Sequence, residues 1–182
     1  MAEAVRRSGA WIACRIGCTQ CCLGPFPVSQ LDVRRLQAGM AALEPEQAAR
    51  LRTRAAAYAA QIGALDADGL PEGMDDIPCP ALDPVTGACE LYEWRPITCR
   101  TFGPATKTGE NSFGICELCY DGVPDSEIRR CAVDVDPGGL EAALIAALDT
   151  AGYRGTMIVA AALLADQSPA AQKEQNGQPG RD

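Results

Sequence analysis

Ten cysteines dominate the chemistry that this sequence can carry, and the chain has no histidine. The cysteines form three groups and one further residue: Cys14-x3-Cys18-x2-Cys21-Cys22, Cys79-Pro80-x8-Cys89 with Cys99, the pair Cys116-x2-Cys119, and Cys131. Soft thiolate ligands favour zinc, iron–sulfur clusters or Cu(I), and they discriminate against Mg²⁺ and Ca²⁺. The residue types therefore predict a metal site built from sulfur.

The missing histidine excludes several classes of site. A Ser-His-Asp triad, a Cys-His pair, a His-Glu-x-x-His metalloprotease site, a Cys₂His₂ finger and a Rieske cluster all need imidazole. Any general base would have to be a carboxylate, a lysine, a tyrosine or a thiolate. No catalytic constellation is recognisable, so whether the protein is an enzyme stays open.

Charge and hydropathy restrict the partners and the compartment. Lys plus Arg is 16 and Asp plus Glu is 24, so the net charge is −8, which argues against nucleic acid and anionic membranes as partners. The N-terminus has only a three-residue apolar step, Trp11 to Ala13, where a secretory signal needs roughly 7–15 apolar residues. The longest apolar run, Met157 to Ala165, falls short of the roughly 20 residues of a membrane span. We expect a cytoplasmic protein whose cysteines are metal ligands rather than disulfides.

The N-terminal cluster allows two local structures. On an α-helix, the four thiols from Cys14 to Cys22 would lie within about 100° of arc on one face. Gly17 weakens that interpretation, and a knuckle loop would gather the thiols equally well. Because neighbours such as Cys21 and Cys22 chelate one tetrahedral ion only with strain, the pair indicates two metal centres, or one ligand beside a second thiol.

The second group has turn and charge signals around it. The sequence Asp-Pro-Val-Thr-Gly predicts a turn that folds Cys79 back toward Cys89. Arg95 and Arg100 flank Cys99, where they could offset the net charge of −2 that four thiolates and a divalent ion carry. A surface ion pair with a nearby glutamate is the alternative for both arginines.

The third group is less specific. Cys116-x2-Cys119 could be half of a metal site, a redox dithiol or a pair of spare thiols. A thioredoxin-like redox motif needs a βαβ context, and the surrounding sequence has none. Cys131 could be a ligand or a buried thiol.

The remaining sequence predicts the elements that position these groups. Helices are expected from Ser29 through Leu43, from Pro45 to Gly63, from Asp136-Pro137 to about Gly152, and over about 155–165. Residues 79–131 keep no period of 2 or 3.6. The fold class expected is mainly α with irregular loops, a small cysteine-rich domain stabilised by metal, with about four helices and little or no β-sheet.

The predicted organisation is a single domain with short extensions. Residues 1–13 are expected to be an N-terminal lead-in, residues 14–165 the cysteine-cluster domain, and residues 166–182 a disordered tail of polar composition.

Two strings of this sequence resemble the YkgJ-type cysteine-cluster family, a CxxCxxCC domain associated with zinc or iron chelation. The strings are the cluster ending in Cys21-Cys22 followed by Pro27, Val28 and Leu31, and the run Cys79-Pro80-x-Leu82, Gly87-x-Cys89, Tyr92-Glu93-x-Arg95-Pro96-x-x-Cys99-Arg100-x-Phe102. The likeness covers roughly residues 14–103, and the first cysteine gap is three residues here instead of two. A similar cluster occurs in flagellin lysine methylases that use an iron–sulfur centre, but this chain is short and their activity is not carried over.

The resemblance implies metal chelation by clustered cysteines, with zinc or iron, including an iron–sulfur cluster, as the cofactor. The expected metal ligands are Cys14, Cys18, Cys21, Cys22, Cys79, Cys89, Cys99, Cys116 and Cys119. The leading hypothesis is a metal-binding protein with a structural or metal-handling role. The alternatives are an iron–sulfur protein or enzyme with redox or radical chemistry, and an interaction module that docks a partner on the alanine-rich helix from Glu44 to Ile62. A metal ion is the one partner that the sequence indicates.

Overall fold

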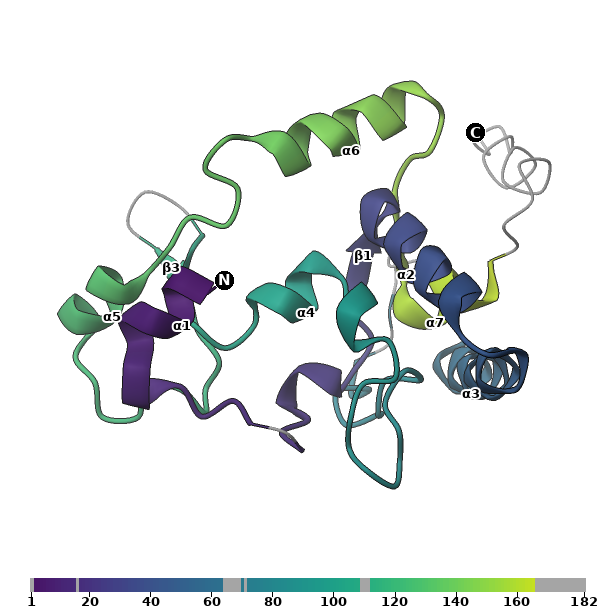
Figure 1. Ribbon diagram of the computed structural model, residues 1–182, viewed down its shortest axis with the longest axis horizontal. Helices are drawn as coiled ribbons and strands as arrows, with labels where there is room; N and C mark the ends of the chain where they lie inside the picture. The colour runs from purple at the N-terminus through teal and green to yellow at the C-terminus, as the bar shows by residue number, and fades with distance from the viewer. Residues whose placement is uncertain (1, 16, 64–69, 71, 109–111, 166–182) are drawn as a thin grey trace.

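The computed structural model describes residues 2–15, 17–63, 70, 72–108 and 112–165 of the chain (Figure 1). The α-helices in these ranges are α1 (Ala2–Ser8), α2 (Gln30–Ala42), α3 (Pro45–Ile62), α4 (Ile97–Thr101), α5 (Asp125–Cys131), α6 (Leu140–Thr150) and α7 (Val159–Leu164). The 3₁₀ helices are η1 (Gly9–Trp11), η2 (Gln20–Cys22) and η3 (Tyr92–Trp94), and the strands are β1 (Pro27–Ser29), β2 (Thr106–Lys107), β3 (Phe113–Gly114) and β4 (Thr156–Ile158).

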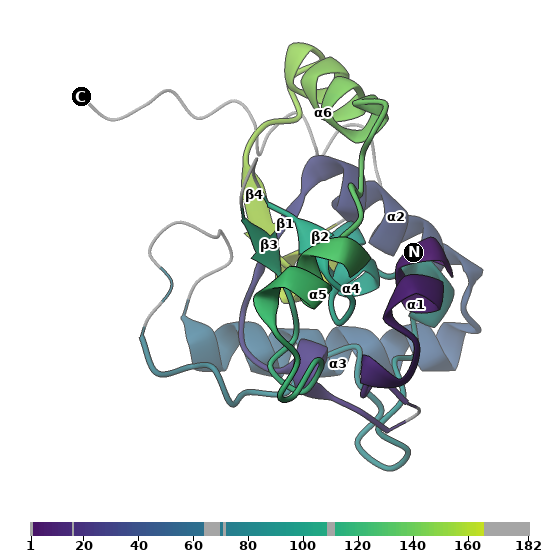
Figure 2. The ribbon, with the colours of Figure 1, turned by 90° about the vertical axis from the view of Figure 1, so that its left-hand side faces the viewer.

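The prediction of about four helices with little or no sheet is wrong. The described residues contain seven α-helices and two small antiparallel sheets, β1 with β4 and β2 with β3 (Figure 2). Helices of five to seven residues, such as α1, α4 and α5, are too short to display a helical period. Strands of two or three residues cannot display alternation either. The pairing of Val28 with Met157 joins segments that lie far apart in the sequence.

The ends of the last two expected helices also differ from the prediction. Helix α6 begins at Leu140 rather than at Asp136, whose carboxylate accepts a hydrogen bond from the Ala142 amide at 3.1 Å. The segment expected as one final helix is divided into strand β4 and helix α7. Residues Thr156–Ile158 pair with Pro27–Ser29 of β1 instead of continuing a helix.

The larger hydrophobic core lies between α2, α3 and α7, on the right in Figure 1. Helix α2 begins with the predicted cap, because the Ser29 hydroxyl accepts from the Asp32 amide and the Asp32 carboxylate accepts from the Ser29 amide. Helix α3 buries Leu51, Ala55 and Tyr58 in this core and packs against α7. The buried face of α3 is therefore covered within the chain, and docking of a partner on this helix remains a prediction.

A second, smaller core forms what we call the small lobe, made of α1, α5 and the residues that pack between them. Its buried members are Ala105, Cys116, Cys119, Tyr120, Ile128, Cys131 and Ala132. The Tyr120 hydroxyl lies 2.5 Å from the Ser8 hydroxyl and accepts from the Ala105 amide at 2.9 Å. The segment expected as a lead-in thus contributes helix α1 to this lobe, on the left in Figure 1.

Helix α6 lies above α4 in the view of Figure 1 and buries none of its side chains. It contacts α2, and in the loop that follows it Tyr153 receives the Arg34 guanidinium 4.3 Å from its ring centre. No helix in the described ranges is long and apolar enough to cross a membrane. The expected tail, 166–182, lies outside the described residues, and the domain boundaries remain predictions.

Candidate metal centre

The structure divides the nine predicted ligands into two groups of thiols, and all ten cysteines are free. The core thiol group contains Cys21, Cys22, Cys79, Cys89 and Cys99, whose charges act on one another. The lobe thiol group contains Cys14, Cys18, Cys116 and Cys119, which interact in the same way among themselves. The structure therefore separates the first two cysteines of the N-terminal motif from the last two.

The backbone from Gly17 to Cys22 forms a loop that allows this separation. Gly17 has a φ of +86°, and the only helical residues in the described part of this segment are the three of η2. The helical alternative for the N-terminal motif is therefore wrong, and the loop alternative is what the structure has. Extended chain beyond η2 then pairs with the segment before Cys79, whose amide donates to the Cys22 carbonyl at 2.7 Å.

The predicted turn brings Cys79 and Cys89 together. The Gly87 amide donates to the Asp83 carbonyl at 2.9 Å, and Leu82 forms an isolated antiparallel bridge with Cys89. Residues on either side of the turn thus run antiparallel, so that the two cysteines at its ends face the same region.

Helix α3 fixes this turn from the side of the larger core. The Arg54 guanidinium donates to the Pro80 carbonyl at 2.9 Å and forms an ion pair with the Glu90 carboxylate. The Gln47 amide donates to the second Glu90 oxygen at 2.9 Å. The sequence carries no signal for Arg54, because an arginine on a helix does not indicate which distant loop it contacts.

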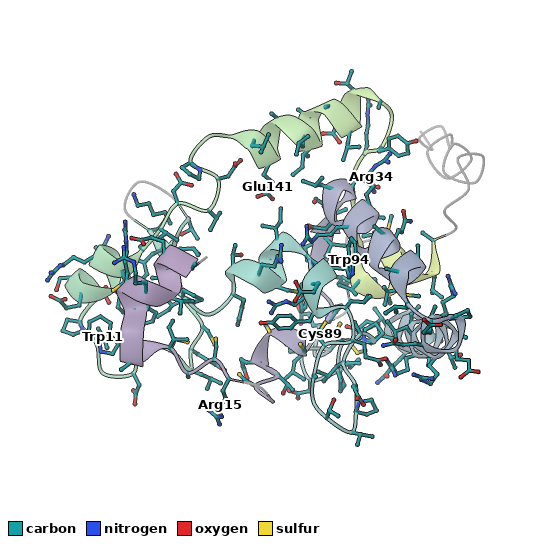
Figure 3. The ribbon with its side chains drawn as sticks, viewed as in Figure 1. Trp11, Arg15, Arg34, Cys89, Trp94 and Glu141 are labelled. Atoms are coloured by element: carbon teal, nitrogen blue, oxygen red, sulfur yellow. The ribbon has the colours of Figure 1, made fainter. Side chains whose placement is uncertain are left out.

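Helix α2 fixes the segment that carries Arg95. Gly39 gives the Trp94 side chain room to lie against the helix, because a Cβ at Gly39 would stand 2.6 Å from Trp94 Cγ. The Arg35 guanidinium donates to the carbonyls of Glu93 at 2.7 Å and Arg95 at 3.1 Å. Figure 3 labels Trp94 and Cys89 in this region, well away from Trp11 in the small lobe.

A buried carboxylate positions helix α4, which carries Cys99. Asp32 is 3% exposed, and its second oxygen accepts from the Ile97 amide at 2.8 Å, at the first residue of α4. The same carboxylate caps α2, so one side chain orients two helix starts. Three chain segments thereby converge on the core thiol group.

The core thiols differ in how readily they ionise. Burial raises the pKa of Cys79 and of Cys99 to about 12, and neighbouring thiol charges add to the shift. The Cys21 and Cys22 sulfurs are 4.0 Å apart, so that one thiol can donate a hydrogen bond to the other. The hydrogen bond between them lowers the pKa of Cys21 to about 6 and raises that of Cys22.

Cations next to the core thiols favour their thiolate forms. Arg95 lowers the pKa values of Cys21, Cys89 and Cys99 by its charge, and Arg54 acts on Cys79 in the same sense. The Arg95 guanidinium lies 3.7 Å from the Tyr92 ring centre and donates to the Tyr92 carbonyl at 3.0 Å. Glu90 is paired with Arg54 rather than with Arg95, and the role of Arg95 as a cation for the thiols remains a prediction.

Backbone amides provide a test of whether the sites fit a thiolate-bound metal. Three cysteine sulfurs accept from the amide two residues further on: Cys79 from Ala81, Cys89 from Leu91 and Cys116 from Leu118. Such donors stabilise the negative sulfur that a metal requires as ligand. With sulfur donors, nearby cations and amides aimed at sulfur, both groups suit zinc or iron.

The thiols within each group are neighbours, but they do not surround a common metal position. Among the residues that the structure describes, no three Cys, Asp or Glu side chains already stand in an arrangement that could hold a metal ion. Protonated thiols attract one another weakly and thiolates repel, so a cation is needed to draw such a group together.

Cys131 lies apart from both thiol groups. It is buried at the end of α5, and its thiol donates to the Arg7 carbonyl of α1 at 3.3 Å. This contact accounts for a buried cysteine in the small lobe without a metal.

Comparison with known proteins gives one match. The family model CxxCxxCC, described as "Putative zinc- or iron-chelating domain", matches residues 13–119, more than half of the chain. No curated protein and no solved structure matches the chain. The match agrees with the sequence-based resemblance and with zinc or iron as the expected cofactor, and it confirms metal binding as the general function of this domain.

Proposed function

Since this chain belongs to the CxxCxxCC zinc- or iron-chelating family, we propose that the core thiol group holds a resident metal. This metal would link the cysteine-containing loops to the core formed by α2, α3 and α7. The observation that supports this is the convergence of five thiols from three segments, each fixed by its own contacts to α2, to α3 or to another segment. The role is structural: the metal ties segments that the hydrophobic core does not cover.

The charge balance of the group is consistent with this role. Four thiolates around a divalent ion carry a net charge of −2, which partly buried surroundings must compensate. Arg95 and Arg54 provide cations beside these thiols, and the amides of Ala81 and Leu91 provide hydrogen bonds to sulfur. When bound, the metal supplies cross-linking bonds, which in small zinc domains contribute about 10–16 kcal/mol.

An iron–sulfur cluster at the same thiols is the second candidate. Five sulfurs exceed the four that one closed zinc site uses. Hydrogen bonds from amides to sulfur also tune iron–sulfur clusters. Both candidates require reduced cysteines and therefore a reducing compartment, in keeping with the predicted cytoplasmic location.

Elemental analysis of the full-length protein, purified without air or chelators, tests the proposal. Zinc, iron and acid-labile sulfide are measured in the wild-type protein, in the double variant Cys79→Ser/Cys89→Ser and in Cys131→Ser as matched control. We expect the double variant to lose the metal of the core thiol group and the control to retain it. Zinc without sulfide identifies a zinc centre, whereas iron with stoichiometric sulfide identifies the second candidate.

A second measurement covers the case in which the double variant does not fold. Alkylation of the native wild-type protein, read residue by residue by mass spectrometry, should label Cys21 and Cys22 only after a chelator is added. Equal labelling before and after chelation, or a double variant with its full metal content, would overturn the proposal.

A further inference from the structure

The small lobe has its own group of thiols, which come from two segments distant in sequence. Cys14 lies against Gly103: a Cβ on that glycine would stand 2.6 Å from the Cys14 sulfur. The Gly103 carbonyl in turn accepts from the Cys116 amide at 3.3 Å. Cys14 is therefore held beside the Cys116–Cys119 turn by a glycine that allows close approach.

A second contact joins the loop between Cys18 and Cys21 to the same turn. The Gln20 side-chain amide donates to the Glu117 carboxylate at 2.5 Å, between the two cysteines of the pair. The Cys119 amide donates to the Cys116 carbonyl at 2.9 Å, which closes the turn, and the Leu118 amide points at the Cys116 sulfur. A tight turn with an amide directed at sulfur suits a Cys-x2-Cys pair that binds metal.

These four thiols are separate from the core thiol group. Cys14 lies beside Cys119, Cys18 and Cys116. Cys22 lies instead beside Cys21, with the two sulfurs 4.0 Å apart, and beside Cys79, whose amide donates to the Cys22 carbonyl at 2.7 Å. The two groups also border different hydrophobic cores, since Cys79 and Cys89 pack on the larger one while Cys116 and Cys119 are members of the smaller one.

In the residues that the structure describes, the hydrophobic core of the small lobe is small. Its core contains seven buried residues, and three of them are cysteines. Helices α1 and α5 have seven residues each, which is below the length at which an isolated helix is stable in water. Hydrophobic cores this small usually need a disulfide or a metal, and the cysteines here are free.

We propose that Cys14, Cys18, Cys116 and Cys119 form a second, separate metal centre, a closed four-thiolate zinc site that joins the N-terminal segment to the Cys116–Cys119 turn. This inference rests on the proposed metal binding of the chain and extends it. The N-terminal motif then serves two centres, with Cys14 and Cys18 in one and Cys21 and Cys22 in the other. Cys21 and Cys22 therefore do not have to bind the same ion as Cys14 and Cys18.

Zinc content of paired variants separates this inference from the proposed function. The full-length Cys116→Ser/Cys119→Ser protein should lose one zinc per chain and keep the metal of the core thiol group, while Cys79→Ser/Cys89→Ser should keep that zinc. Cys131→Ser, a change in the same small core, should lose none. If Cys116→Ser/Cys119→Ser loses no metal, or loses all of it, the second centre is overturned.

Labelling of the wild-type protein gives a readout that does not depend on variants that fold. Cys14 is exposed in the structure, so a free thiol there would react at once with an alkylating reagent. We expect slow labelling of Cys14 in the zinc-loaded protein, fast labelling after chelation, and protection restored by added zinc. Immediate labelling of Cys14 while Cys21 stays protected would refute the second centre and leave the proposed function intact. The reverse pattern would refute the proposed function alone.

Discussion

Replacement of Gly103 by alanine gives a specific test of how the small lobe holds its thiols. Gly103 has a φ of +112°, where an L side chain is strained, and its new Cβ would stand 2.6 Å from the Cys14 sulfur. Ordinary contacts of a Cβ begin at 3.4 Å, so the sulfur must retreat by about 0.8 Å. Because Cys14 is exposed, its thiol can turn toward solvent at little cost in folding free energy.

The two consequences of this substitution are separable. Backbone strain should lower the free energy of unfolding by about 1–3 kcal/mol. Displacement of Cys14 should in addition remove one of the four sulfurs from the lobe thiol group. Gly122→Ala is the matched control, since Gly122 has a φ of +69° and nothing lies within 4 Å of its Cβ position. That variant carries strain without a clash.

Denaturant unfolding and zinc analysis of the two variants test the reasoning. We expect both variants to lose stability, with the larger loss in Gly103→Ala, and we expect a loss of zinc and a faster alkylation of Cys14 in Gly103→Ala alone. A Gly103→Ala protein with full zinc content and a slowly labelled Cys14 would show that the contact between these residues does not position a ligand.

Two further predictions concern the larger core and its thiols. Arg95→Gln removes a cation that favours three thiolates, so protons should compete better with the metal for the sulfurs. The pH at which half of the metal is released should therefore be higher than in the wild type. A pH titration of metal release measures this midpoint, and an unchanged midpoint would refute the role of Arg95. Leu51→Ala empties a fully buried position between α3 and α7 and should lower the free energy of unfolding by about 2–5 kcal/mol. Leu140→Ala, on the exposed face of α6, is the control and should change the free energy of unfolding by less than about 0.5 kcal/mol in the same assay. Equal losses in the two variants would contradict the assignment of the core.

Local signals in the sequence were sufficient for the longer helices. Ser29 and Asp32 predicted the start of α2, and Pro45 with Gly63 predicted both ends of α3, because caps and breakers act through contacts only a few residues away. The cysteine spacing and the family resemblance likewise predicted metal binding, since thiolate chemistry depends on residue types more than on the fold. These features required no knowledge of distant contacts.

The tertiary structure alone decided how the cysteines are shared out. Spacing suggested one continuous motif from Cys14 to Cys22, but Cys14 pairs in space with Cys119 while Cys22 pairs with Cys79. Packing against α2, α3 or α5 determines which distant segment approaches a given cysteine. The residues of a short segment do not indicate this packing.

The same limit applies to the residues that support the thiols and to the short elements of the fold. Arg54 reaches the turn after Cys79 from another helix, and Gly103 admits the Cys14 sulfur only because the two segments cross there. Strands β1 and β4 have three residues each and are defined by hydrogen bonds to one another rather than by a pattern within either. The sequence therefore determined the chemistry of the ligands and the long helices, whereas long-range packing determined the number and composition of the thiol groups.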